Sequence, residues 1–150
     1  MDRLTGVRLV TVHHDGMSPW YASAENDTGA RIDAIRRSHQ QSNGWGDIGY
    51  HFVVDRAGRI WEGRPLVYQG AHVKYHNPGN IGVLCLGNFD RQDPTERQVA
   101  ALERHLQALM NHYRVPVKLV HTHQELRPTA CPGRSLQGAV NSMRWSGRLA

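Results

Sequence analysis

The run Ile81–Leu86 is apolar from end to end, and this limits the architectures open to the chain. Such a run is typical of a central strand that is buried on both faces of a sheet. A second segment, Leu9–His13, is rich in β-branched residues and predicts a strand that ends at a histidine. We expect one sheet built on such strands, with helices packed against it.

Further strand signals lie in the middle of the chain and toward its end. Tyr50–Asp55 and Arg59–Glu62 flank Arg56–Gly58, a pattern that predicts a β-hairpin with glycine at the left-handed turn position. Val117–His121 predicts a strand that delivers the chain to His123.

Helical patterns alternate with these strands. One helix is predicted from the caps offered by Asn26–Thr28 to about Gln41. The clearest helix covers Pro94–Arg114, which Thr95 can cap, and a short terminal helix is predicted over Ser135–Arg144. Apolar residues repeat at helical spacing along the second of these and predict a core-facing stripe: Val99, Leu102, Leu106, Leu109, Met110 and Tyr113.

Length and composition fit one domain. A chain of 150 residues is long enough to bury a core without disulfides or metal. Its hydrophobic fraction of 39% and charged fraction of 21% are those of a soluble globular protein. Because no apolar run approaches the roughly 20 residues that span a bilayer, we expect no membrane insertion. The prediction is a single α/β domain over residues 1–150, with one mixed sheet flanked by about three helices.

Histidine and cysteine are spaced in a way that suits a metal. His123 and Cys131 lie eight residues apart across a loop interrupted by proline, so that both side chains can turn toward one point. A further imidazole comes from His13 or His14, at the end of the first predicted strand. Two imidazoles and one thiolate suit zinc and leave a fourth tetrahedral position open. The alternative is that these are ordinary surface or core residues, since the chain has 10 histidines.

The two cysteines have different surroundings in the sequence. Cys85 lies within the apolar run, where a thiol behaves as a small hydrophobic side chain. A disulfide between Cys85 and Cys131 would consume the candidate ligand, and we expect both thiols to be reduced.

Six short motifs follow one another along the chain: Val12–His14, Gly44–Phe52, Trp61–Arg64, Gly70–His72, Asn80–Val83 and His123–Gly133. In this order they resemble the zinc-dependent N-acetylmuramoyl-L-alanine amidases of type 2. That family includes phage amidase lysozymes and peptidoglycan recognition proteins. The resemblance runs from about Val10 to Gly133 and implies the fold of that family.

The resemblance implies that His13, His123 and Cys131 are zinc ligands. The family ligand aligns with His13, and alternation along a strand prevents His13 and His14 from both pointing inward. For His121, two residues before His123, the alternatives are a residue that supports the metal ligands and an ordinary core or surface histidine, and the second is favoured.

Two further residues are implied in catalysis. The family tyrosine that stands beside the zinc corresponds to Tyr50. Thr129 lies two residues before Cys131, where phage lysozymes of the family carry lysine and catalytic recognition proteins commonly carry threonine. A hydroxyl there can orient water or hydrogen-bond an oxyanion, but it supplies no positive charge.

The motifs that line the substrate groove in the family contain Trp45, Arg64, His72 and Asn80. An aromatic face suits a sugar ring, and polar groups can bind peptide carbonyls and carboxylates. The structural alternatives are a core position for Trp45, a surface ion pair for Arg64 and a turn for Asn80.

The implied activity is hydrolysis of the amide bond between N-acetylmuramic acid and L-alanine in peptidoglycan, as in a bacteriolytic endolysin, with Zn²⁺ as cofactor. One alternative is a non-catalytic module that binds peptidoglycan. The other is a zinc peptidase that acts within the stem peptide. Non-catalytic members typically lose a ligand, whereas this chain keeps all three.

Charge and the amino terminus set expectations about partners and location. A net charge of +5 favours a polyanionic partner, either the bacterial wall or nucleic acid. The basic residues are dispersed and form no nucleic-acid motif, which favours the wall. Met1–Thr5 shows no secretory signal, so we expect synthesis in the cytoplasm, delivery to the wall by other means, and a monomer.

Overall fold

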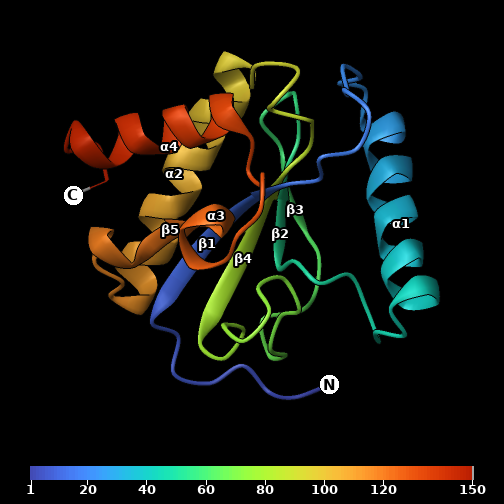
Figure 1. The fold of residues 1–150 in the computed structure, drawn as a ribbon, viewed down its shortest axis with the longest axis horizontal. Helices are drawn as coiled ribbons and strands as arrows, with labels where there is room; N and C mark the ends of the chain where they lie inside the picture. The colour runs from blue at the N-terminus through green and yellow to red at the C-terminus, as the bar shows by residue number, and fades with distance from the viewer. Residues whose placement is uncertain (150) are drawn as a thin grey trace.

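A mixed sheet with helices on both sides forms the centre of the computed structural model, which describes residues 1–149 (Figure 1). The strand order is β3-β2-β4-β1-β5, and only the β2–β3 pair is antiparallel. The predicted fold class is confirmed. The strands are β1 (Leu9–His14), β2 (Phe52–Val54), β3 (Ile60–Glu62), β4 (Asn80–Cys85) and β5 (Val120–Thr122).

The apolar run predicted as a central strand lies at the centre of the sheet. Every residue of β4 and of its parallel neighbour β1 is buried. Side chains alternate between the two faces along each strand. Ile81 and Val83 therefore pack into the larger core, whereas Leu84 packs into the smaller one on the other face.

Helices cover the two faces unequally (Figure 1). α2 (Glu96–Tyr113) and α4 (Arg134–Trp145) lie on one face and supply much of the larger core. α1 (Glu25–Ser42) lies alone on the other face, where Ile35 packs into the smaller core. A single turn, α3 (His123–Leu126), follows β5 directly. Among residues 1–149, none of the helices combines the length and apolarity needed to cross a bilayer.

Two predicted element boundaries are wrong. Residues Val117–Leu119 form a 3₁₀ turn in which the Leu119 amide donates to the Pro116 carbonyl at 2.9 Å, so the strand begins only at Val120. α1 begins at Glu25, and the Asn26–Thr28 segment lies inside its first turn without capping it. The acidic side chains of Glu25 and Asp27 in that first turn stabilise the helix instead, because they lie near the positive end of its dipole.

Two local predictions are confirmed. The Thr95 hydroxyl caps α2 by accepting from the Gln98 amide at 3.0 Å. In the β2–β3 hairpin, Gly58 has a φ of +86°, the left-handed conformation that favours glycine.

A buried carboxylate holds the hairpin together. Asp55 is 0% exposed, and one of its oxygens accepts from the amides of Ala57 at 3.0 Å and Arg59 at 2.8 Å. Its other oxygen accepts from Arg59 Nη1 and from Trp61 Nε1, each at 3.0 Å. Four donors therefore depend on one side chain.

We predict that Asp55→Ala lowers the free energy of unfolding by about 3 kcal/mol, because it leaves several donors without their acceptor. Urea denaturation would measure the change. Asp33→Ala is the matched control, since Asp33 pairs with Arg36 and Arg37 on the exposed side of α1. It should cost less than about 0.5 kcal/mol. Equal costs for the two variants would contradict this account of the hairpin.

Candidate metal centre

Three side chains from distant parts of the chain converge at one edge of the sheet. Ligand atoms of His13, His123 and Cys131 all lie within 4.8 Å of one another. His13 Nδ1 lies 3.6 Å from Cys131 Sγ, and the rings of His13 and His123 have centroids 4.7 Å apart. β1 and β5 are parallel, so their carboxyl ends reach the same edge and bring the two histidines together.

The adjacent His14 points to the opposite face of the sheet. Its Nδ1 accepts from the Phe89 amide at 3.1 Å, and its ring stacks on Phe89. Its backbone amide donates to Cys131 Sγ at 3.3 Å. His14 thus contributes to the centre through its backbone, as alternation along the strand predicts. His121 lies outside the cluster, 3.8 Å from the Glu125 carboxylate.

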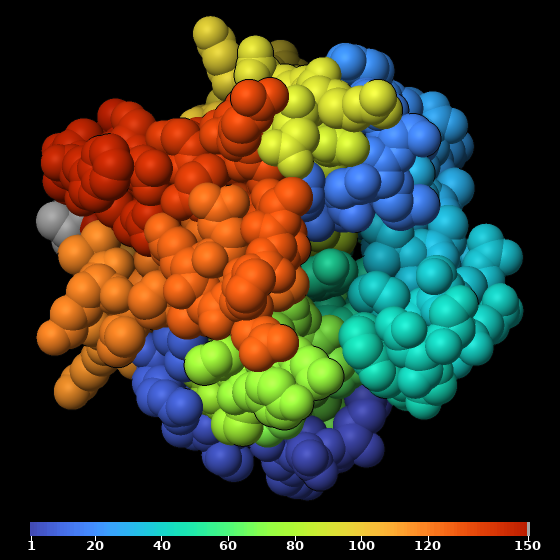
Figure 2. Space-filling model, viewed as in Figure 1, coloured from blue at the N-terminus to red at the C-terminus, as the bar shows by residue number. Residues whose placement is uncertain are grey.

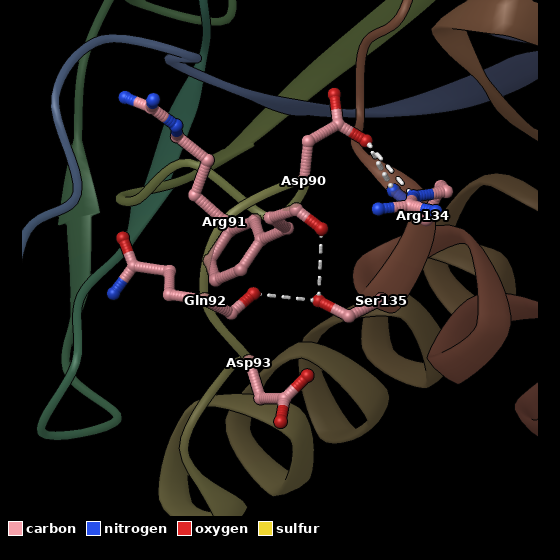
Figure 3. Close-up of a pocket in the computed structure, with 7 residues that line it drawn as sticks. Asp90, Arg91, Gln92, Asp93, Arg134 and Ser135 are labelled. Atoms are coloured by element: carbon pink, nitrogen blue, oxygen red, sulfur yellow. Dashed lines mark hydrogen bonds and ion pairs between the residues drawn. The ribbon is translucent and has the colours of Figure 1, made fainter.

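The turn that carries Cys131 is fixed by a joint between the loop after β4 and the start of α4 (Figure 3). The Arg134 amide donates to Asp90 Oδ1 at 3.0 Å. The Ser135 hydroxyl lies 3.0 Å from the Phe89 carbonyl and 2.8 Å from the Gln92 carbonyl. Figure 3 shows these groups around a surface hollow of about 410 Å³. They are paired with one another, which gives the hollow a structural role.

Burial determines the charge state of the three candidate ligands. It lowers the pKa of His13 well below its usual value, with help from the neighbouring His72 and His123. Burial likewise lowers the pKa of His123, and Arg127 adds to this. Burial raises the pKa of the Cys131 thiol to about 12. Two neutral imidazoles and a thiol that ionises when a cation binds form a donor set that fits a borderline-soft metal.

A groove of about 430 Å³ opens beside this cluster. Figure 2 shows the face of the molecule as hollowed between α1, in cyan, and the orange segment that contains α3. His123 lines the groove, so the candidate metal centre adjoins a space that a ligand could enter. The other lining residues are His39, Trp45, Tyr50, Ala71, His72, Val73, Lys74 and Asn77.

The two predicted catalytic residues lie beside the centre in different ways. The Tyr50 ring lies 5.1 Å from that of His13, centroid to centroid, and lines the groove. Burial raises the pKa of Tyr50, so its phenol stays protonated and can donate a hydrogen bond. Thr129 is exposed, and its hydroxyl accepts from the Cys131 amide at 3.2 Å.

Of the four predicted ligand-contacting residues, Trp45 lines the groove and packs edge-on against His39. Arg64 and Asn80 have structural roles instead. The buried Arg64 guanidinium donates to the carbonyls of Ile48, Gln69 and Asp47 at 2.8, 2.7 and 3.1 Å.

The Asn80 side chain is fully buried. It accepts from the Thr11 hydroxyl at 2.9 Å and donates to the His76 carbonyl at 2.8 Å. Because Asn80 and Arg64 are both buried, their polar atoms are not available to a ligand in the groove.

His72 lines the groove but uses both ring nitrogens inside the protein. Its Nδ1 lies 2.9 Å from His13 Nε2, and its Nε2 lies 3.0 Å from the Asn80 carbonyl. Burial lowers the pKa of His72 to about 3, so the ring is neutral near pH 7. The predicted polar contact between His72 and a ligand is replaced by a contact with His13.

Sequence reasoning missed three polar residues of the groove. Lys74 and Asn77 follow the Gly70–His72 motif closely, and that proximity is the only sequence signal for them. His39 lies near the end of α1, outside every motif, and no sequence signal marks it. Its Nδ1 accepts from the Gly49 amide at 3.0 Å, so it also braces the segment before Tyr50.

Comparisons with known proteins show what this chain is similar to. The family model described as N-acetylmuramoyl-L-alanine amidase matches residues 3–134. The chain is 35% identical over 124 residues to the endolysin of Enterobacteria phage K11, covering 79% of each chain. It is 28% identical over 138 residues to peptidoglycan-recognition protein SC1a of Drosophila melanogaster, covering 91% of this chain and 74% of that protein.

A solved structure gives the same result for the fold. Drosophila PGRP-LB superposes with a TM-score of 0.85 at 26% identity, covering 94% of this chain and 84% of that one. With its sheet, its groove and the cluster of His13, His123 and Cys131, the chain belongs to the N-acetylmuramoyl-L-alanine amidase family.

Proposed function

We propose that this protein is a zinc-dependent hydrolase that cleaves the amide bond between N-acetylmuramic acid and L-alanine in peptidoglycan. The observation that carries the proposal is the convergence of His13, His123 and Cys131 within 4.8 Å beside a groove. Family membership and the similarity to a phage endolysin support the choice of bond.

The candidate ligands would hold zinc through two imidazole nitrogens and one thiolate. When bound there, the metal supplies an electrophile that polarises a carbonyl and acidifies water. The protonated Tyr50 phenol, on the groove wall beside His13, is placed to donate to the amide oxygen as negative charge develops on it. Thr129 holds the backbone of Cys131 through its hydroxyl, and so supports the ligand loop.

The groove suits a glycopeptide. Trp45 offers an aromatic face to a sugar ring, and Lys74 offers an ammonium to a peptide carboxylate. The net charge of +5 adds a general attraction to an anionic wall. These features support peptidoglycan as the ligand under all three functional alternatives.

A binding module that does not cleave peptidoglycan is the second candidate, because the relatives include peptidoglycan-recognition proteins. The complete set of His13, His123 and Cys131 favours the enzyme, since a pure binder has no need of three metal donors around one point.

The first functional prediction concerns the bond that is cleaved. Digestion of purified peptidoglycan should release free stem peptides that begin at L-alanine and leave glycan strands with intact lactyl groups. Mass spectrometry of the products would identify them. Fragments cut within the stem peptide would indicate a peptidase, and sedimentation with the wall without any products would indicate a binder.

A second prediction concerns the metal. The protein should hold about one zinc per chain, and Cys131→Ser should lose most of the zinc together with activity. Cys85→Ser is the matched control, because Cys85 is a fully buried free thiol within β4. It should keep its zinc at some cost in stability. Elemental analysis that finds equal zinc in Cys131→Ser and wild type would remove Cys131 from the ligand set.

A third prediction separates chemistry from binding. Tyr50→Phe keeps the ring against His13 and removes only the hydroxyl. Turnover of a soluble muropeptide should fall by roughly one to three orders of magnitude, while zinc content and muropeptide affinity change little. Steady-state kinetics and calorimetry measure these quantities. Unchanged turnover in a folded, zinc-loaded variant would exclude the hydroxyl from the mechanism.

A further inference from the structure

Three histidine rings follow one another from His51 through His72 to His13, which is one of the candidate metal ligands. The centroids of His51 and His72 are 5.9 Å apart, and those of His72 and His13 are 5.0 Å apart, with the rings edge-on in each pair. In this row only His13 Nδ1 faces the cluster of candidate ligands, 3.6 Å from Cys131 Sγ. Which nitrogen of His13 carries the proton therefore decides whether this ring can bind a metal.

The carbonyl of Asn80 sets the direction of the hydrogen bonds. A carbonyl can only accept, so the proton of the neutral His72 ring lies on Nε2, 3.0 Å from the Asn80 oxygen. His72 Nδ1 then carries a lone pair. It accepts from His13 Nε2 at 2.9 Å, and His13 Nδ1 is left with the lone pair that a metal requires.

The reverse arrangement is unfavourable. A proton on His72 Nδ1 would place the lone pair of Nε2 against the Asn80 oxygen at 3.0 Å. His72 is 8% exposed, and two facing acceptors at that depth lose a hydrogen bond without water to replace it.

Two glycines make room for this arrangement. A Cβ at Gly82 would lie 2.7 Å from the His72 ring, and one at Gly70 would lie 2.6 Å from it. Both ring nitrogens of the neighbouring His51 are hydrogen-bonded to the backbone: Nδ1 accepts from the Gly82 amide at 3.0 Å, and Nε2 donates to the Tyr68 carbonyl at 2.9 Å. The surroundings of His72 are therefore shaped around its ring.

We propose that His72 is a positioning residue that locks His13 in the tautomer protonated at Nε2 and so presents Nδ1 to the metal. Hydrogen-bond partners behind metal-binding histidines generally fix the tautomer and ring orientation in this manner. The inference rests on the zinc site of the proposed function, and it assigns His72 a role through His13 and not through substrate.

The tautomer can be measured without metal or substrate. Nitrogen NMR of metal-free protein labelled with ¹⁵N-histidine should show His13 protonated at Nε2 and unprotonated at Nδ1, with His72 likewise protonated at Nε2. A proton on His13 Nδ1, or a mixture of tautomers, would overturn the proposal. Because this readout needs no zinc, it decides the role of His72 even if the proposed enzymatic function fails.

Two substitutions then separate hydrogen bonding from packing. His72→Asn is smaller than histidine but keeps an acceptor at the place of Nδ1, whereas His72→Leu fills the space without one. Zinc affinity, measured by competition with a chromogenic chelator, should fall about 10- to 100-fold in His72→Leu and remain mostly intact in His72→Asn. Wild-type affinity in His72→Leu, or an equal loss in both variants, would overturn the proposal. Circular dichroism verifies that each variant is folded.

Discussion

Parallel pairing of β1 with both β4 and β5 is the constraint on which the rest of the molecule depends. The register that joins Val12 to Thr122 brings the next residues, His13 and His123, to the same edge of the sheet. Parallel strands have their carboxyl ends at the same edge of a sheet, so residues that follow different strands can meet there without long loops. The joint at the start of α4 then brings Cys131 to the same point from the other direction.

The two faces of the sheet have different tasks. The face toward α2 and α4 is apolar and holds the larger core. The face toward α1 gives up part of its apolar packing to buried polar residues, among them Thr11, His13, His51 and His72. Each of these four makes hydrogen bonds inside the protein, which makes their burial tolerable. Stability is concentrated on one face and the candidate chemistry on the other.

Burial has opposite consequences for the ligands and for Tyr50. It keeps the imidazoles of His13 and His123 neutral and therefore able to bind a metal, but it disfavours the charged thiolate of Cys131. A bound cation would reverse that last effect. The same burial keeps the Tyr50 phenol protonated, so it can serve as a donor but not as a base. The environment thus distinguishes the residues that are suited to bind a cation from Tyr50, which is suited to donate a hydrogen bond.

The sequence by itself determined the elements and the candidate ligands. Apolar runs and helical periodicity are local properties, and they predicted β4, β1 and α2 because each of these is buried along a regular pattern. The resemblance of the ordered motifs to the type 2 amidases singled out His13, His123 and Cys131 among the 10 histidines and two cysteines of the chain. Only the tertiary structure decided what Arg64, Asn80 and His72 do. Their partners include the Ile48 carbonyl for Arg64, the Thr11 hydroxyl for Asn80 and the His13 ring for His72. These partners come from other segments of the chain, and no local pattern indicates which polar atoms will be buried together. His39 and Lys74 line the groove but could not be predicted from the sequence for the same reason. Their positions depend on how separate segments pack around the groove, and not on their neighbours in the chain.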